Sequence, residues 1–271
     1  MGACCGNLAC ITRVIKNCLS YHNEKILENR YAISLRLLER YAQKRFPYLK
    51  RREAMLQTIS IMLLKCEGTL ILKHPEYQMD HQLKLHQVHN HKINNIENDD
   101  CCYELNDEEN ELLLKLQSAF KHSEKLNAHV KFLYKKGSMY LCVNQMLLYH
   151  GCVPIDKNGH FTGIKVNEHL YKGKELFEYC EQQARKAYYK RDLEAIDFMF
   201  YLWSGYHSPL SGRELKTFER IYIHDEKVWV EKRNPYYQFY HQEEICCQIL
   251  KEFQMDPKKC HIINGHTPVK L

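Results

Sequence analysis

The chain has 271 residues, of which 45% are hydrophobic and 27% are charged. Its length allows one large domain or two smaller ones, and its composition excludes wholesale disorder. The formal net charge of +6 suits an anionic small substrate but falls short of the concentrated basic surface that nucleic-acid binding requires. The 13 cysteines contain no C-x-x-C spacing and follow no secretory signal, which disfavours a zinc ribbon and a disulfide scaffold. We therefore expect a cytoplasmic protein with reduced thiols and no membrane-spanning segment.

Residues 1–73 have the spacing of apolar side chains that is typical of amphipathic helices. The pattern is present over residues 11–19 and 33–41. It breaks at Pro47 and resumes over residues 55–64. We interpret this part of the chain as a helical segment whose apolar faces pack together.

Residues 74–106 are rich in histidine, asparagine and aspartate and poor in apolar side chains. The spacing His86-x-x-His89-x-His91 is compatible with adventitious metal binding, but nothing nearby supplies the partners that orient metal-bound histidines. A solvated linker or variable insertion is the favoured interpretation.

Residues 107–271 alternate helix and strand patterns, which predicts an α/β portion. Asn106 and the acidic residues after it form a helix start, and Gly137 ends a second helix. Asn144-Gln145 separates two short strand patterns and predicts a hairpin turn. The remaining predicted elements are a turn at residues 156–159, two helices within 172–202, a last helix over 242–253 and a strand over 261–264.

Each of two histidines stands beside a glycine at the end of a strand pattern: His150 precedes Gly151, and His266 follows Gly265. A strand that ends in such a turn projects the imidazole from the sheet edge, and the glycine lets a metal or phosphate approach the backbone. In open α/β sheets, ligands bind beyond the carboxyl ends of the strands. His150 and His266 are therefore candidate metal ligands, although a hydrolytic metal centre needs more ligands than these two.

Five blocks of sequence, in the right order and with matching lengths between them, resemble a known family. The blocks are residues 132–141, 147–154, 217–220, 234–237 and 262–270. Together they resemble the class III, or Firmicutes-type, fructose-1,6-bisphosphatases, which are manganese-dependent bacterial enzymes of the calcineurin-like metallophosphatase superfamily. The similarity extends over essentially the whole chain. It implies an α/β fold, a partial metallophosphatase sandwich with a large helical portion at the N-terminal side.

The resemblance implies hydrolysis of fructose 1,6-bisphosphate to fructose 6-phosphate and phosphate, a step of gluconeogenesis, at a two-metal Mn²⁺ site. By motif position, His150 and His266 resemble the two late histidine ligands of that site. Arg213, Lys216 and Arg220 surround the Ser-Pro-Leu-Ser-Gly segment at 208–212, which departs from the family's usual loop, and the matching block at 217–220, and they carry the charge that a bisphosphate site needs. The expected partner is fructose 1,6-bisphosphate, a homo-oligomer is left open, and neither nucleic acid nor a membrane is expected.

Three earlier motifs of the family do not occur in this chain: Asp-x-His, Gly-Asp-x-x-Asp-Arg and Gly-Asn-His-Asp. In the family they carry the bridging aspartate, an asparagine ligand and the catalytic histidine, so we expect no catalytic residue in this chain. The chain resembles the middle portion of a longer enzyme. We therefore expect it to be weakly active or inactive alone.

Two other interpretations remain open. One is a different metallophosphatase, such as a protein phosphatase or a dinucleoside-polyphosphate hydrolase, which shares the Gly-His-Thr-Pro ending. The other is a catalytically silent helical interaction module, since most metal ligands are missing. Substrate competition on a full-length protein would separate the two enzymes, and a manganese titration would identify a silent module.

Overall fold

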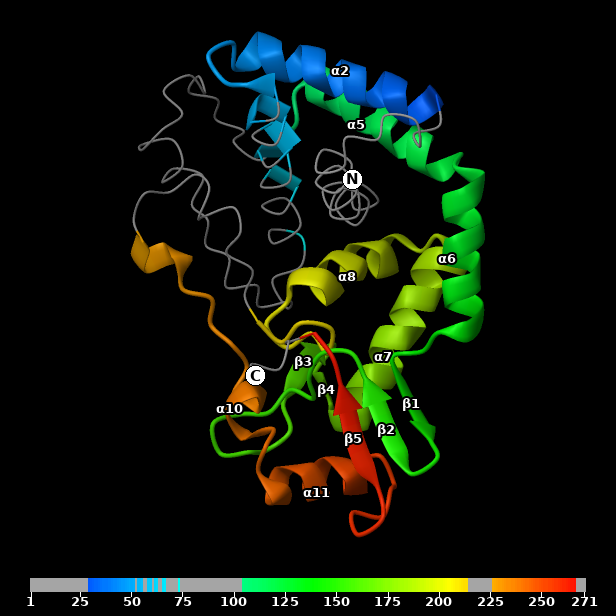
Figure 1. Ribbon diagram of the computed structural model, residues 1–271, viewed down its shortest axis with the longest axis vertical. Coiled ribbons are helices and arrows are strands. Elements are labelled where there is room, and N and C mark those ends of the chain that lie inside the picture. The colour runs from blue at the N-terminus through cyan, green and yellow to red at the C-terminus, as the bar shows by residue number, and fades with distance from the viewer. Residues whose placement is uncertain are drawn as a thin grey trace. The chain divides into compact units, whose positions relative to one another are not determined.

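The computed structural model describes residues 29–51, scattered positions between 53 and 73, and residues 104–213 and 226–266. These residues form both helices and strands, so the predicted mixed α/β class is confirmed (Figure 1). They belong to two compact units that divide after residue 137. No helix among them is long and apolar enough to cross a membrane.

The unit before residue 138 is helical over most of its described part. Helix α2 (Asn29–Arg45) ends just before Pro47, as predicted, because proline lacks the amide donor that a continuing helix needs. Helix α5 (Asp107–Lys121) packs against α2, and α6 (Glu124–Lys136) follows it in the chain.

Capping explains where α5 and α6 begin and end. The Asn106 side chain accepts the Glu109 N–H at 2.8 Å, while the Glu109 carboxylate accepts the Asn106 N–H at 3.1 Å, which completes a capping box. The Ser123 hydroxyl oxygen accepts the Leu126 N–H in the first turn of α6. Gly137 caps the end of α6. The predicted helix start at Asn106 and the predicted stop at Gly137 are thus confirmed.

Other predictions for this part of the chain have mixed outcomes. The helix predicted over residues 55–64 is confirmed at its described positions. The pattern at 11–19 and the histidine-rich residues 74–103 lie outside the described residues. The helices over 107–136 belong to the same compact unit as α2. The division into residues 1–73, 74–106 and 107–271 stays a prediction.

Glu109 also forms the centre of a buried charged cluster. Lys65 Nζ donates to one carboxylate oxygen at 2.9 Å, and Arg45 donates to the other. Burial opposes ionisation of Glu109, but the hydrogen bond and charge of Lys65 and the charge of Arg45 outweigh it. The pKa of Glu109 is therefore lowered, and its carboxylate stays charged inside the helical unit.

The second unit is built on a three-stranded sheet in the order β1-β2-β5. Strands β1 (Tyr140–Val143) and β2 (Met146–Tyr149) are antiparallel, and β5 (His261–Asn264) lies parallel to β2. Asn144 and Gln145 have φ values of 49° and 61°, which are typical of a tight hairpin turn. The predicted hairpin and the predicted final strand are both confirmed.

The helices predicted within residues 172–202 and over 242–253 are also present. Gln242 and Phe253 cap the last helix rather than lying within it. The described helical segments of this unit are α7 (Gly173–Arg185), a π-helical turn (Lys186–Lys190), α8 (Leu193–Ser204), a 3₁₀ turn (Glu226–Trp229), α10 (Tyr236–Phe239) and α11 (Glu243–Glu252).

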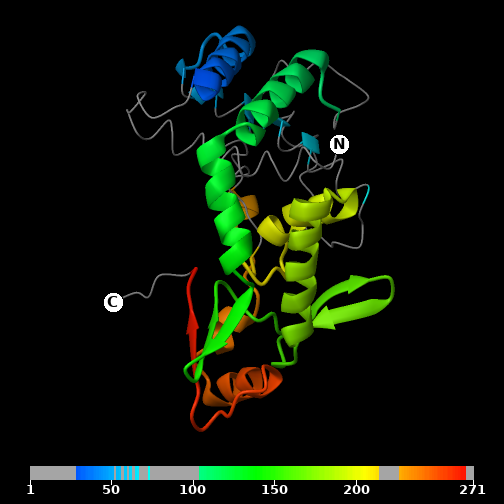
Figure 2. The ribbon, with the colours of Figure 1, turned by 90° about the vertical axis from the view of Figure 1, so that its right-hand side faces the viewer.

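A second hairpin, formed by β3 (Gly163–Val166) and β4 (His169–Lys172), has no counterpart among the predicted elements. Its turn residues Asn167 and Glu168 have φ values of 47° and 68°. The turn therefore adopts left-handed backbone without the glycine that normally marks it in a sequence. Figure 2 shows this hairpin beside the start of α7 and apart from the three-stranded sheet.

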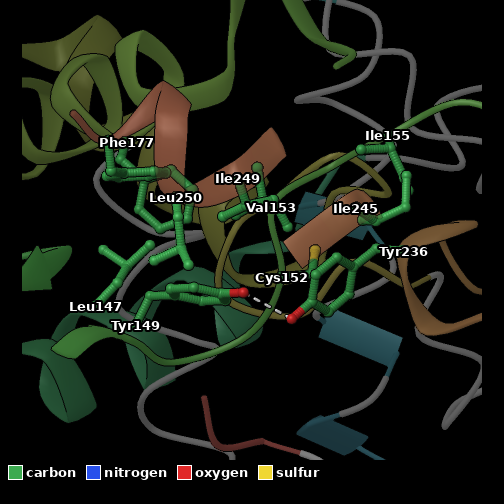
Figure 3. Packing of buried hydrophobic residues seen from close by; sticks show 11 residues of the cluster. Leu147, Tyr149, Cys152, Val153, Ile155, Phe177, Tyr236, Ile245, Ile249 and Leu250 are labelled. Carbon is green, nitrogen blue, oxygen red and sulfur yellow. Dashed lines mark hydrogen bonds between the residues drawn. The ribbon is translucent and has the colours of Figure 1, made fainter. Parts of the chain in front are cut away.

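The inner face of the three-stranded sheet carries the hydrophobic core of this unit. Leu147 and Tyr149 of β2 cluster with Phe177 of α7 and with Ile249 and Leu250 of α11 (Figure 3). Removal of these side chains from water is the main driving force for packing the two helices on the sheet.

The outer face of the same sheet is apolar but exposed. The strand register aligns Leu141, Leu148 and Ile263 in one row across the three strands. Leu141 is 53% exposed and Ile263 is 49% exposed. Parallel strands are normally covered on both faces, so an exposed row of this kind is typical of a surface that packs against a further layer.

Candidate metal centre

His150 and His266 lie together where β2 and β5 end. Because these strands are parallel, their carboxyl ends meet at one edge of the sheet, which is where the sequence places a ligand site. Nδ1 of His266 is 3.2 Å from Nε2 of His150, and the ring centroids are 5.1 Å apart. Two residues separated by 116 positions in the sequence therefore face each other.

The geometry of this pair suits chelation of one cation. Imidazole nitrogens bind transition metals at about 2.0–2.1 Å, so two neighbouring nitrogens on one ion lie about 3 Å apart. The observed 3.2 Å matches that spacing, and it also allows an N–H of one neutral ring to donate to the other ring. Neutral imidazole binds Mn²⁺, Fe²⁺ and Zn²⁺, so the donor type does not select the metal.

Two imidazoles do not complete a metal centre. In the parts of the chain that the structure describes, no three or more His, Cys, Asp or Glu side chains are grouped so that they could hold a metal ion. His150 and His266 can therefore supply only part of a coordination shell. The remaining ligands would have to be water or groups outside the described residues.

Gly151 is required by the backbone that surrounds it. A Cβ atom at this position would lie 2.5 Å from the carbonyl oxygens of Pro209 and Leu210. The neighbouring Cys152 N–H donates to the Pro209 carbonyl at 3.0 Å. The loop after α8 thus packs directly against the His150 turn, and only glycine leaves room for it.

Gly265 contributes in a different way. Its N–H donates to the His150 carbonyl at 2.9 Å, and a Cβ added to it would meet that oxygen at an ordinary 3.5 Å. The left-handed conformation belongs instead to His266, with φ of 65°. This conformation costs a residue with a side chain about 1–2 kcal/mol, and such strain clusters at functional sites.

A network of neutral side chains joins the two histidine turns. Asn264 Nδ2 donates to the Gly151 carbonyl at 3.2 Å and to the Tyr236 hydroxyl at 2.9 Å. The Tyr236 hydroxyl is in turn 2.7 Å from the Tyr149 hydroxyl (Figure 3). Burial raises the pKa of both tyrosines, so their hydroxyls remain uncharged hydrogen-bonding groups.

Asn234 fixes Tyr236 against the segment that follows β2. Its Oδ1 accepts the N–H of Ile155 at 3.1 Å and the N–H of Tyr236 at 3.0 Å. The Tyr237 hydroxyl donates to the Ser211 carbonyl at 2.6 Å, which ties the loop after α8 to the same block. The Asn-Pro-Tyr-Tyr sequence therefore connects three segments that surround the histidine turns.

Of the three predicted substrate residues, the structure describes only Arg213. Arg213 forms an isolated β-bridge with Arg233, and its Nη1 is 3.7 Å from the Glu231 carboxylate. Lys216 and Arg220 lie outside the described residues. A substrate role for Arg213, Lys216 and Arg220 stays a prediction.

The sequence did not single out Asn264, Tyr236 or Asn234 as site residues, although all three lie in blocks that carry the family resemblance. One local signal was available. Asn264 follows two isoleucines at the end of a strand pattern, and a polar residue there requires a hydrogen-bonding partner once it is buried. The partner itself could not be identified without the fold.

Comparison with known proteins assigns the family. All of residues 1–271 match the model of the Firmicute fructose-1,6-bisphosphatases. The chain belongs to this family. No solved structure matches it.

Several curated relatives of this chain are named class 3 fructose-1,6-bisphosphatases. It is 38% identical to a class 3 fructose-1,6-bisphosphatase of Clostridium beijerinckii, 39% identical to one of Lacticaseibacillus casei and 38% identical to one of Fusobacterium nucleatum. Each match covers 100% of this chain but only 47%, 48% and 47% of the respective relative. The chain therefore spans about half the length of the curated relatives it matches.

Proposed function

We propose that this chain supplies the late, histidine-bearing part of a two-metal fructose-1,6-bisphosphatase centre, which hydrolyses fructose 1,6-bisphosphate to fructose 6-phosphate and phosphate. The meeting of His150 and His266 at the shared carboxyl edge of β2 and β5 carries this proposal. Each histidine would donate one imidazole nitrogen to a metal ion. In two-metal phosphatases the ions polarise the phosphoryl oxygens and activate water.

Manganese and a role in cytoplasmic gluconeogenesis are parts of the same proposal, and both are supported by the family resemblance. Arg213, Lys216 and Arg220 would bind the phosphate groups. The Arg213–Glu231 separation of 3.7 Å exceeds a hydrogen bond, so the guanidinium retains capacity for a phosphate oxygen. The family assignment disfavours a protein phosphatase or a dinucleoside-polyphosphate hydrolase.

We also propose that the exposed outer face of β1-β2-β5 is one half of a metallophosphatase sandwich. The row of Leu141, Leu148 and Ile263 has the apolar character that a second sheet would cover. About half of each relative's length lies outside the match, which is enough polypeptide for such a layer.

The chain alone should have little or no phosphatase activity. A centre formed by two imidazoles alone has no anionic bridging ligand, which is the group that holds two cations close together. A catalytically silent interaction module is the alternative outcome.

The test combines Mn²⁺ calorimetry with a phosphate-release assay on fructose 1,6-bisphosphate. Replacing His86, His89 and His91 by Gln first removes adventitious binding. We expect weak Mn²⁺ binding that His150→Ala reduces, and no phosphate release. His160→Ala is the matched control, because His160 is exposed and pairs with Asp156 rather than with either proposed ligand.

Two results would contradict the proposal. Equal Mn²⁺ binding by the parent chain and His150→Ala would remove the ligand assignment and favour the silent module. Phosphate release that disappears in His150→Ala would show that the centre is complete within this chain.

A further inference from the structure

We propose that Asn264 is a positioning residue that joins the two histidine turns, so that His150 and His266 reach one metal ion as a pair. The inference rests on the proposed ligand role of the two histidines. Asn264 is the last residue of β5 and lies two positions before His266. Through its side chain it contacts the turn that carries His150.

The amide of Asn264 has one orientation that satisfies its neighbours. A backbone carbonyl can only accept, so the amide nitrogen must face the Gly151 oxygen, 3.2 Å away. The second proton of that nitrogen is directed at the Tyr236 hydroxyl, 2.9 Å away. Both N–H groups are thus engaged, and a flip of the amide would place its oxygen against the Gly151 carbonyl oxygen and break that contact.

A second link between the same turns makes the Asn264 contact decisive for orientation. The Gly265 N–H donates to the His150 carbonyl at 2.9 Å. The β2–β5 ladder aligns the two segments as far as the Tyr149–Asn264 pair, and this bond extends the alignment by one residue. The Asn264–Gly151 bond adds a side-chain link beyond the ladder and so restricts the directions in which both imidazoles project.

The Tyr236 hydroxyl anchors this link to the core. Tyr236 is 2% exposed and Tyr149 is 5% exposed, and their hydroxyls are 2.7 Å apart. Asn264 is therefore held by groups that cannot move without disturbing the packing of the sheet. Removal of an outer-shell group that orients a metal ligand typically lowers metal affinity about 10–100-fold.

The test is a Mn²⁺ titration of the full chain, monitored through the imidazole NMR resonances of His150 and His266. The resonances are assigned with His150→Gln and His266→Gln, and paramagnetic Mn²⁺ broadens those near a bound ion. In the parent chain we expect both resonances to broaden over the same Mn²⁺ range. In Asn264→Ala we expect both curves to require about 10-fold more Mn²⁺.

The metal-free spectra provide an independent readout. Asn264→Ala should shift the imidazole ¹⁵N resonances of both histidines, because the 3.2 Å contact between the rings would be lost. Unchanged ¹⁵N shifts would overturn the positioning role. Changed shifts without any Mn²⁺ broadening in the parent chain would leave positioning of the pair intact and overturn the proposed ligand role.

Two further variants separate positioning from stability. Tyr236→Phe removes the hydroxyl that accepts from Asn264 and should change the curves in the same direction by a smaller factor, which also serves if Asn264→Ala does not fold. Ile249→Val removes one carbon from the buried core on α11 without touching a histidine turn. An equal increase in the Mn²⁺ that Ile249→Val requires would overturn the proposal.

Discussion

The two units bury polar groups in opposite ways. The helical unit buries a charged carboxylate, Glu109, between Arg45 and Lys65. The α/β unit joins neutral groups instead, through the amide of Asn264 and the hydroxyl of Tyr236. A charge removed from water needs an opposite charge, whereas a neutral group needs only a hydrogen-bonding partner.

This difference has a consequence for function and for stability. A neutral network behind His150 and His266 orients them without adding a charge that would attract or repel a cation. Removal of one partner from the ionic cluster leaves an uncompensated buried charge, which costs more than the loss of one neutral hydrogen bond. The variants below test this contrast.

Glu109→Gln should have the largest effect on stability. The change leaves Arg45 and Lys65 without the carboxylate that compensates them, and it should lower the free energy of unfolding of the helical unit by about 3 kcal/mol. Chemical denaturation followed by helical circular dichroism measures this loss. Glu108→Gln is the control, because the Lys44–Glu108 pair is exposed and solvent screens it, so its loss should change stability far less. Equal losses in the two variants would show that the buried cluster is not ionic.

Gly151→Ala should have the next largest effect. Its Cβ would press on the Pro209 and Leu210 carbonyl oxygens, and we expect a loss of about 2 kcal/mol as the loop is displaced. Gly265→Ala has ordinary contact distances and should change stability by about 0.5 kcal/mol or less. Thermal unfolding of both variants compares the two histidine turns, and a larger loss in Gly265→Ala would contradict the described geometry.

The two units should also respond to opposite extremes of pH. The lowered pKa of Glu109 gives stability that is present above the ordinary value of 4.5 and is lost as the pH falls through the lowered pKa. Burial raises the pKa of Tyr149 and Tyr236, so their contribution is present below about pH 10 and is lost as the pH rises further. Amide resonances of each unit, recorded against pH, follow the two transitions.

Variants make the pH experiment specific. Glu109→Gln should reduce the loss of stability of the helical unit at low pH. Tyr236→Phe should reduce the loss of stability of the α/β unit at high pH. Other groups add background, since burial raises the pKa of Cys152 and Cys180 and lowers the pKa of His207 in the α/β unit. Asp156 has a lowered pKa from backbone hydrogen bonds but is exposed, and burial raises the pKa of Tyr41 in the helical unit. An acid transition unchanged by Glu109→Gln would exclude this carboxylate as its source.

Substitution on the outer face of the sheet should have the smallest effect. Ile263→Thr changes an exposed side chain and should alter stability by no more than about 0.5 kcal/mol, while it reduces binding of a hydrophobic dye. Ile262→Thr, one residue away on the inner face, should cost about 1 kcal/mol or more. Equal costs would show that the two faces do not differ in burial.

Local chemistry made several elements predictable. The Asn106 helix start, the stop at Gly137 and the Asn144-Gln145 hairpin each depend on neighbours within a few residues, and each is confirmed. The Asn167-Glu168 turn has the same left-handed backbone as Asn144-Gln145, but its hairpin was missed because β3 and β4 mix lysine and histidine with apolar residues, whereas β1 and β2 are continuous apolar runs. In that case the pairing of β3 with β4, rather than the turn residues, stabilises the unusual backbone.

The sequence by itself determined strands β1, β2 and β5, the histidines that follow β2 and β5 and, through five ordered blocks, the family. Only the tertiary structure decided that β2 and β5 are parallel neighbours, that His150 and His266 lie 3.2 Å apart, and that Asn264 joins their turns. The physical reason is the sequence separation of the residues that interact. Caps and turns are set by adjacent residues, whereas register between segments 116 positions apart depends on how the core packs, which no local pattern encodes.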